Sequence, residues 1–229
     1  MEQMDRCFRK VLQRCQETKK KMPKRIVVAI LHGLCSAVKY LHEKGLMHRD
    51  IKPANILFNE DGTLKLADFG KARMLGKGNT FTVESGTERY YAPERFQGTY
   101  NEQCDIWSVG IVAIELLTLQ HPILKQKEKL TDSAVTKGMH WTYCQIVDNP
   151  DDIFHLPADE FPDFRAFVDD CLMKDYNKRP GIKELMLNSI FNDKPGKATQ
   201  DELVSWYKHL MKSSSFSDRV VDGYKWLVG

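Results

Sequence analysis

The stretch that decides the fold covers residues 48–70 and reads HRDIKPANILFNEDGTLKLADFG. Within it, the short apolar run 56–58 and a second strand-like stretch, Leu-Lys-Leu at 64–66, flank the turn-forming residues Asn-Glu-Asp-Gly at 59–62. Apolar runs separated by such a turn predict a β-hairpin. The hairpin would bring Asn55, just before its first strand, close to Asp68, just after its second.

Helical patterns lie on both sides of this stretch. Apolar residues recur at helical spacing from Ile26 to Leu41, and Gly45 is expected to end that helix. Residues 105–117 read DIWSVGIVAIELL and are apolar nearly all round, which predicts a helix inside the domain. Shorter helices are expected at 3–16, 164–172, 182–186 and 199–211, the last opened by a capping box of Thr199 and Glu202.

Residues 68–100 show no periodicity and are interpreted as a long ordered loop, a feature that is usually functional. The fold class expected from these patterns is mainly α with a short β-hairpin.

Composition narrows the class of protein. The chain has 229 residues, 42% hydrophobic and 28% charged, which is ordinary for a globular domain. No apolar run reaches about 18 residues, so no membrane span is expected. Six scattered cysteines without a C-x-x-C pair favour reduced thiols, and hence the cytosol or nucleus. The net charge of +3 is too small to indicate nucleic acid binding.

The basic residues are concentrated near the start, where residues 19–25 read KKKMPKR. Such a run could form a docking patch or a nuclear signal. The simpler interpretation, a solvated loop before a helix, is favoured because charge runs usually lie on solvated faces.

Three motifs follow one another in order: HRDIKPAN at 48–55, DFG at 68–70 and APE at 92–94. Their order and spacing resemble the eukaryotic protein kinase family. The resemblance covers residues 1–193, interpreted as a hinge and C-terminal lobe, and leaves 194–229 as a C-terminal helix and tail. The hinge-like residues 1–5 and the region of the APE motif are similar to MAP kinase kinases.

The resemblance implies the C-terminal lobe of the α+β kinase fold. It also implies transfer of the γ-phosphate of ATP to a hydroxyl of a protein substrate, in phosphorylation signalling. Asp50 would orient or accept the proton of the substrate hydroxyl, and Lys52 would steady the γ-phosphate. Asn55 and Asp68 offer the hard oxygen atoms that suit Mg²⁺. Leu57 would lie beneath the adenine.

By the same resemblance, Thr87 matches the threonine of Ser/Thr kinases whose hydroxyl binds the catalytic aspartate. Together with Lys52 it favours a Ser/Thr or dual-specificity enzyme. Other matching residues imply structural roles. Glu94 should pair with Arg179, and Asp105 should hold the backbone of the catalytic loop. His48 and Phe69 should belong to a hydrophobic stack, and Gly70 should let the backbone turn after Asp68.

Arg49, directly before Asp50, implies regulation by phosphorylation with help from Arg73, because arginine binds phosphate through a bidentate fork. The acceptors would be Thr80, Thr82 and Ser85, and an upstream activating kinase would be a partner. In MAP kinase kinases the phosphorylated Ser/Thr residues correspond to the positions of Asn79 and Val83 in this chain. The available acceptors Thr80 and Thr82 each lie one residue away from these positions, which departs from the MAP kinase kinase pattern. The alternatives are a segment that is always ordered, or an Arg49 that is purely structural.

The chain contains no G-x-G-x-x-G motif and no V-A-I-K lysine. Both belong to the N-terminal lobe, which holds the α- and β-phosphates of ATP. That lobe is therefore expected to be absent, and the chain alone to be inactive. It could be a fragment of an active kinase, a natural truncated form, or one of two chains that complete each other. The functional alternative is a non-catalytic interaction module or a pseudokinase-like regulator.

Overall fold

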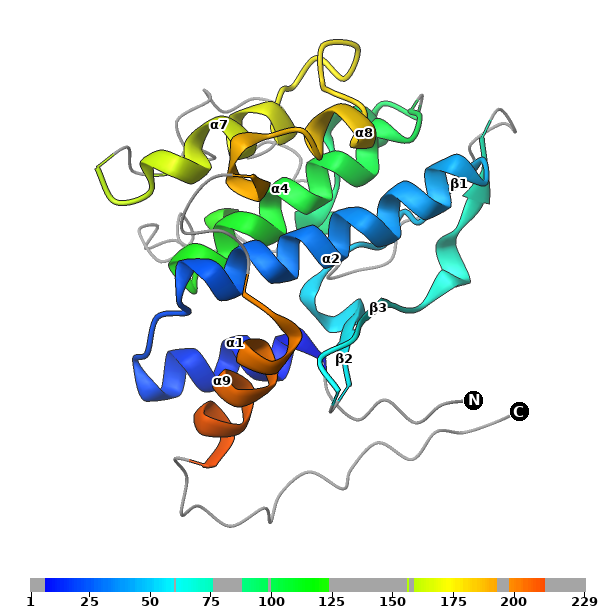
Figure 1. The fold of residues 1–229 in the computed structure, drawn as a ribbon. Coiled ribbons are helices and arrows are strands. Elements are labelled where there is room, and N and C mark those ends of the chain that lie inside the picture. Colours follow the sequence, from blue (N-terminus) through cyan, green and yellow to red (C-terminus); the bar gives the residue numbers. More distant parts are fainter. Residues whose placement is uncertain are drawn as a thin grey trace, which may run out of the picture.

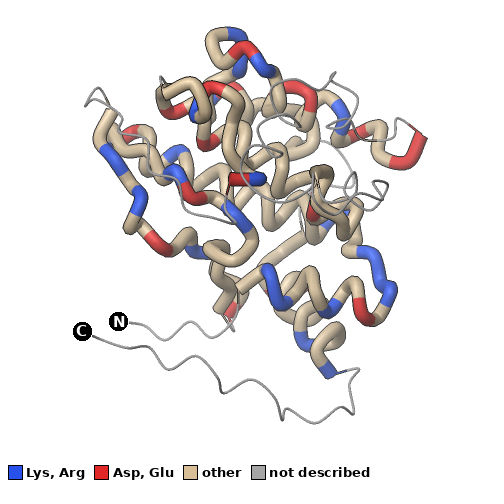
Figure 2. Tube along the Cα trace, turned by 180° about the vertical axis from the view of Figure 1, so that it is seen from behind, with Lys and Arg blue, Asp and Glu red and all other residues tan. Residues whose placement is uncertain are grey.

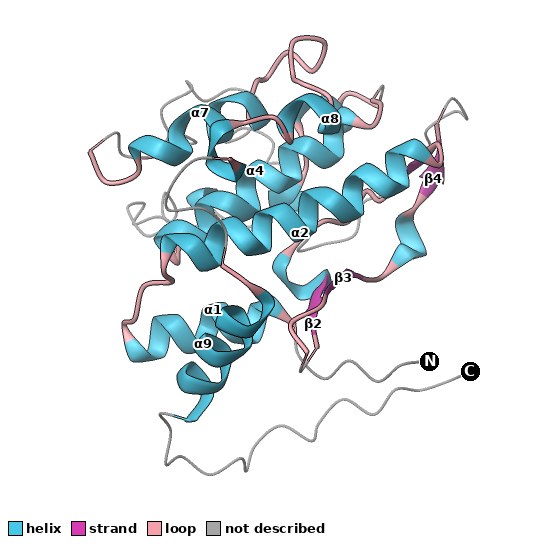
Figure 3. Cartoon of the chain, viewed as in Figure 1, coloured by secondary structure: helices cyan, strands magenta, loops and turns pink. Residues whose placement is uncertain are grey.

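The computed structural model describes residues 7–59, 61–75, 88–98, 100–123, 156, 159–192 and 198–212. Helices dominate these residues, and the strands form two small antiparallel sheets (Figures 1 and 3). The expected fold class, mainly helical with a short hairpin, is confirmed for the described part of the chain. The expected boundary at 193/194 falls outside these residues and stays a prediction.

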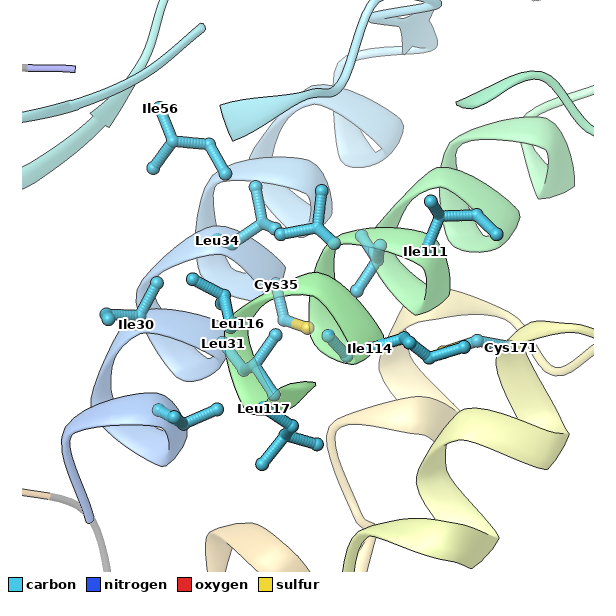
Figure 4. Close-up of a cluster of buried hydrophobic side chains, with 14 of the residues drawn as sticks. Ile30, Leu31, Leu34, Cys35, Ile56, Ile111, Ile114, Leu116, Leu117 and Cys171 are labelled. Atoms are coloured by element: carbon cyan, nitrogen blue, oxygen red, sulfur yellow. The ribbon is translucent and has the colours of Figure 1, made fainter. Parts of the chain in front are cut away.

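Two long helices form the centre of the molecule, α2 (Lys24–Glu43) and α4 (Gln103–Thr118). They pack side by side, and α7 (Pro162–Cys171) covers α4. Figure 4 shows the buried side chains that interlock between them, which are Ile30, Leu31, Leu34 and Cys35 of α2, Ile111, Ile114, Leu116 and Leu117 of α4, and Cys171 of α7. The interior position predicted for residues 105–117 is thus confirmed.

Helix α2 is also the one described helix that is long and apolar enough to cross a membrane by length and composition. Half of its apolar window is buried inside the structure, and the helix contacts both α4 and the hairpin. A core helix with apolar faces toward several neighbours has the same composition.

The predicted hairpin is present, with β2 (Ile56–Phe58) antiparallel to β3 (Leu64–Leu66). The amide of Asn59 donates to the carbonyl of Thr63 at 3.0 Å, and Gly62 turns the chain with φ +88°. The hairpin lies so close to α2 that a Cβ on Gly33 would be 2.6 Å from Cδ1 of Leu64. A residue with a Cβ would therefore be strained at both positions, by the positive φ at Gly62 and by the contact with Leu64 at Gly33.

The prediction of a loop without secondary structure over residues 68–100 is wrong in part, because the described residues there form short regular elements. These are η2 (Phe69–Lys71), β4 (Arg73–Met74), η3 (Glu88–Tyr90) and α3 (Pro93–Phe96). Strand β4 pairs with β1 (Leu46–Met47), which lies almost thirty positions earlier. A ladder of two residues is too short to leave a periodic signal.

The remaining elements are α1 (Phe8–Thr18), η1 (Pro53–Asn55), α8 (Ile182–Leu185), η6 (Ser189–Phe191) and α9 (Gln200–Lys212). Helices α7 and α8 lie on one side of the central pair, and α1 and α9 on the other (Figure 1). The predicted capping box of α9 is confirmed. The amide of Thr199 donates to Glu202 Oε2 at 2.8 Å, and the amide of Glu202 donates to Thr199 Oγ1 at 3.2 Å.

The basic run at 19–25 is tied to acidic residues elsewhere in the chain. Lys21 pairs with Glu160, and Lys24 lies 3.7 Å from Asp163. Arg25 lies 2.9 Å from Glu202 on α9. Figure 2 shows lysine and arginine interspersed with aspartate and glutamate over the described trace. The pairing favours a structural interpretation of the basic run over a docking patch.

Candidate active site

The backbone of the loop that begins at His48 is held by one buried carboxylate, that of Asp105 at the start of α4. Its Oδ1 accepts from the amide of Arg49, and its Oδ2 from the amide of His48, both at 2.8 Å. Nε2 of His42 also lies 2.9 Å from Oδ2. Burial alone would raise the pKa of Asp105, but these hydrogen bonds and the nearby His42 lower it below its ordinary value. Asp105 therefore stays ionised and keeps its loop contacts.

Asp50 lies at the centre of a cluster of hydrogen-bond donors. Nζ of Lys52 is 2.7 Å from its Oδ2, and the side-chain amide of Asn55 donates to the same oxygen at 2.9 Å. Nζ of Lys71 is 3.2 Å from its Oδ1. Burial alone would raise the pKa of Asp50, but the two lysines lower it below its ordinary value. Asp50 is therefore an ionised carboxylate that can accept a hydrogen bond from a hydroxyl.

The contact of Lys71 with Asp50 was missed by sequence reasoning. Lys71 directly follows the DFG motif, so its position could have drawn attention to it. Its partner lies 21 residues earlier, however, and only the folding of the hairpin brings the two together. The candidate site thus contains a second cation beside Asp50, opposite Lys52.

Asn55 connects the loop that begins at His48 to the end of the hairpin. Its side-chain amide nitrogen also donates to the carbonyl of Asp50 at 2.8 Å. Its own backbone carbonyl accepts from the amide of Ala67 at 2.9 Å. This second bond brings Asp68, the next residue along the chain, to the same end of the hairpin as Asn55. The sequence predicted this proximity.

The backbone turn at the DFG motif is made by Asp68 rather than by Gly70, which corrects the expectation. Asp68 has φ +66°, in the left-handed region, while Gly70 is not among the positive-φ residues. Aspartate tolerates this region because its short side chain can hydrogen-bond locally. Here it accepts from the amide of Gly70 at 3.3 Å.

The donor set at this end of the hairpin fits Mg²⁺. The amide nitrogen of Asn55 is committed to Asp50, so the amide oxygen remains for a cation, and the carboxylate of Asp68 is exposed. Within the described ranges no group of three or more His, Cys, Asp or Glu residues could hold a metal. Mg²⁺ does not require one, because it keeps several waters and commonly binds one or two carboxylates plus substrate phosphates.

His48 and Phe69 are in contact, as the resemblance implied, with ring centroids 5.1 Å apart in an edge-on arrangement. Nδ1 of His48 accepts from the amide of Asp50 at 3.2 Å, so Nε2 carries the proton and donates to the carbonyl of Ala67 at 3.0 Å. Burial lowers the pKa of His48, which favours this neutral form. Phe69 is about half exposed (49%). Leu57, the predicted adenine contact, is half-buried in β2.

Glu94 and Arg179 form the expected buried pair. Nη1 of Arg179 is 2.6 Å from Oε1 of Glu94, and Nη2 is 3.2 Å from Oε2. The same guanidinium also donates to the carbonyls of Met173 and Gln103. This pair ties α3 to the segment before α8.

The predicted regulatory residue Arg49 lies beside Tyr100. The guanidinium of Arg49 is 5.3 Å from the ring of Tyr100. Burial raises the pKa of the Tyr100 hydroxyl, and the charges of Arg49, Arg95 and Arg73 partly offset this effect. Arg73 itself is exposed on β4. The predicted residues Thr80, Thr82, Ser85 and Thr87 lie outside the described residues, so their roles stay predictions.

Comparison with known proteins identifies the class. The family model of the protein kinase domain matches residues 1–191. The chain therefore belongs to the protein kinase family, as its motifs predicted.

Relatives with curated descriptions include several MAP kinase kinases. The chain is 34% identical over 218 residues to dual specificity mitogen-activated protein kinase kinase 7 of Homo sapiens. The matched region covers 92% of this chain and 48% of that protein. It is 36% identical over 180 residues to mitogen-activated protein kinase kinase 2 of Arabidopsis thaliana, covering 76% and 47%. It is 35% identical over 190 residues to MAP kinase kinase MKK1/SSP32 of Saccharomyces cerevisiae, covering 80% and 35%. The chain thus spans about half the length of the first two.

Proposed function

We propose that this chain forms the catalytic-loop side of a protein Ser/Thr or dual-specificity kinase of the MAP kinase kinase type, acting in the cytosol or nucleus. The reaction is transfer of the γ-phosphate of ATP to a hydroxyl of a protein substrate. The observation that carries the proposal is the ionised, buried Asp50 between Lys52 and Asn55, inside a loop whose backbone is held by Asp105.

Each residue has a role that follows from its surroundings. The carboxylate of Asp50 would accept the hydrogen bond of the substrate hydroxyl and aim its oxygen at the γ-phosphate. Lys52, held 2.7 Å from Asp50, would place a positive charge beside the transferred phosphoryl group. Lys71 would add a second charge on the other side of Asp50. Phosphoryl transfer depends mainly on such positioning and charge stabilisation.

Asn55 and Asp68 would hold Mg²⁺ through their side-chain oxygens. When bound, Mg²⁺ supplies charge neutralisation to the phosphate oxygens of ATP. The glycine-rich loop and lysine that grip the α- and β-phosphates are not found in residues 1–229. We therefore propose that this chain provides one wall of the nucleotide cleft and that an N-terminal lobe provides the other.

The partners follow from the same branch of the family. The relatives are named as kinases that act on MAP kinases, so a protein substrate of that kind is proposed here. An upstream kinase would phosphorylate the segment that contains Thr80, Thr82 and Ser85. Arg49, whose guanidinium lies 5.3 Å from the ring of Tyr100, would receive the phosphate with help from Arg73.

The test is a phosphotransfer assay with Mg-ATP and myelin basic protein. It uses the 229-residue chain alone and the same chain fused to the N-terminal lobe of a MAP kinase kinase. We expect activity only in the fusion. Asp50→Asn should lower the rate by about 10²- to 10⁴-fold, the usual contribution of an acid–base group.

The matched control is Asp163→Asn, at an aspartate on the surface of α7, which should retain the parent's rate. If Asp50→Asn keeps activity within about tenfold of the parent, the role of Asp50 is wrong. If the fusion has no activity while it binds partner proteins, the non-catalytic alternative is favoured.

A further inference from the structure

The peptide unit between Arg49 and Asp50 is held in an unusual way. Arg49 has φ +68°, in the left-handed region that residues with a Cβ rarely adopt. Such a conformation persists only when the surrounding structure holds it in place. Asp105 supplies one restraint by accepting from the amide of Arg49. Asp105 does not touch the carbonyl side of the same residue, so a second restraint is needed there.

That restraint comes from Arg95 on α3. Its Nη1 donates to the carbonyl oxygen of Arg49 at 2.7 Å, across 46 positions of sequence. Arg95 is almost fully buried (3% exposed). Its guanidinium stacks 3.5 Å from the ring centre of Tyr91 and 5.6 Å from that of Tyr100. The two rings therefore fix the direction in which the guanidinium points.

Nothing in the described part of the chain pairs Arg95 with a carboxylate. Burying a charge is unfavourable unless the charge is compensated. The aromatic faces compensate it in part through cation–π attraction, and the carbonyl of Arg49 accepts its hydrogen bond. An ion pair therefore does not explain Arg95, whereas the contact with Arg49 does.

We propose that Arg95 is a positioning residue that sets the position of Asp50. The peptide group between Arg49 and Asp50 is planar. Its carbonyl is held by Arg95, and its amide donates to Nδ1 of His48 at 3.2 Å. With both ends of the plane held, the position of the Asp50 Cα is held as well, and the contacts of Lys52, Asn55 and Lys71 then orient the carboxylate from that position.

Helix α3, which carries Arg95, is itself held in place by another contact. Its neighbour on α3, Glu94, is paired with the buried Arg179. Helix α3 is only four residues long and would be a weak support by itself. Because α3 is tied on one side to Arg179 and on the other to Arg49, it links the catalytic loop to the segment before α8. The role of Arg95 in catalysis rests on the function proposed for Asp50.

The first experiment needs no catalysis and uses the 229-residue chain. Amide hydrogen exchange is compared in the parent, in Arg95→Met, which keeps the apolar stem, and in Arg95→Lys, which keeps a charge and a single donor nitrogen in place of the planar guanidinium. A hydrogen bond from a charged group is lost in Arg95→Met. Exchange of the Arg49 and Asp50 amides should therefore accelerate by about tenfold or more, while the core amides of α2 stay unchanged. Arg95→Lys should accelerate it less.

The matched control is Arg165→Met, the same substitution at a half-exposed arginine on α7. It should leave the exchange of both loop amides at the parent's rate. Unchanged exchange at Arg49 and Asp50 in Arg95→Met would overturn the proposal. So would acceleration spread evenly over the whole chain, because that result would give Arg95 a general structural role.

The second experiment measures kinetics in whichever form, chain alone or fusion, shows phosphotransfer. Misplacing a catalytic group by a fraction of an ångström to an ångström lowers the rate, so kcat of Arg95→Met should fall by about 10- to 100-fold. KM for ATP should change less than about twofold, since the contact acts in the transition state. An unchanged kcat overturns the positioning role. If the parent is inactive in both forms, the proposed function fails, and the exchange measurement still decides whether Arg95 holds the loop.

Discussion

Replacing Arg179 with alanine should destabilise this protein more than any change at its exposed neighbours. The Arg179 side chain is fully buried (0% exposed) and Glu94 nearly so. Besides the two bonds to Glu94, the guanidinium donates to the carbonyls of Met173 and Gln103 at 2.6–3.0 Å. Arg179→Ala would remove all of these bonds and leave the carboxylate of Glu94 buried without a counter-ion.

Breaking one partner of a buried ion pair costs about 3–5 kcal/mol. In a domain of this size each kcal/mol lowers the melting temperature by about 2–4 °C, so the expected fall is roughly 6–20 °C. The control is Lys178→Ala at the adjacent position, where the side chain is 77% exposed and Nζ is 3.7 Å from Asp175. An exposed pair of this kind contributes about 0–1 kcal/mol, so the control should shift the melting temperature by a few degrees at most.

The assay is thermal unfolding followed by circular dichroism at pH 7. The double variant Glu94→Gln with Arg179→Ala removes the stranded charge as well. It should therefore be more stable than the sum of the two single changes predicts. Equal melting temperatures for Arg179→Ala and Lys178→Ala, or additive effects in the double variant, would refute the reasoning.

Three further predictions concern packing, pH and capping. Gly110→Ala would place a Cβ 2.6 Å from Cβ of Cys171 and so overpack the contact between α4 and α7. The free energy of unfolding, measured by denaturant titration, should fall by about 1–3 kcal/mol. An unchanged midpoint would show that the two helices can separate freely. Burial lowers the pKa of His121 from 6.5 to about 3, so the unfolded state binds a proton first as pH falls, and stability is lost from about pH 6.5 downward. His121→Phe should therefore lose about 2 kcal/mol less than the parent between pH 7 and pH 5, and an identical pH dependence in both proteins would contradict this. Thr199→Ala removes the cap of α9 and should cost about 0.5–2 kcal/mol, with faster amide exchange confined to the first turn of that helix.

Much of the local structure could be predicted from the sequence by itself. The helical spacing of apolar residues indicated α2, because residues on the buried face of a helix recur at regular intervals. The nearly continuous apolar stretch at 105–117 indicated α4 as a helix inside the domain. The turn residues 59–62 indicated the hairpin, and Thr199 with Glu202 indicated the start of α9. The order of the HRD, DFG and APE motifs indicated the protein kinase family and identified Asp50, Lys52, Asn55 and Asp68 as candidates. All of these signals lie within one short segment of chain or in the order of such segments.

Only the tertiary structure decided how the candidate site is supported. The contacts of Lys71 with Asp50 and of Arg95 with Arg49 join residues 21 and 46 positions apart. The left-handed backbone at Asp68, where the sequence suggested Gly70, was also seen only in the structure, although its bond to the amide two residues later is local. A single contact between distant residues repeats nowhere along the chain and so leaves no periodic pattern. It exists because the packing of α2, α4 and the hairpin brings these side chains within hydrogen-bonding distance of each other.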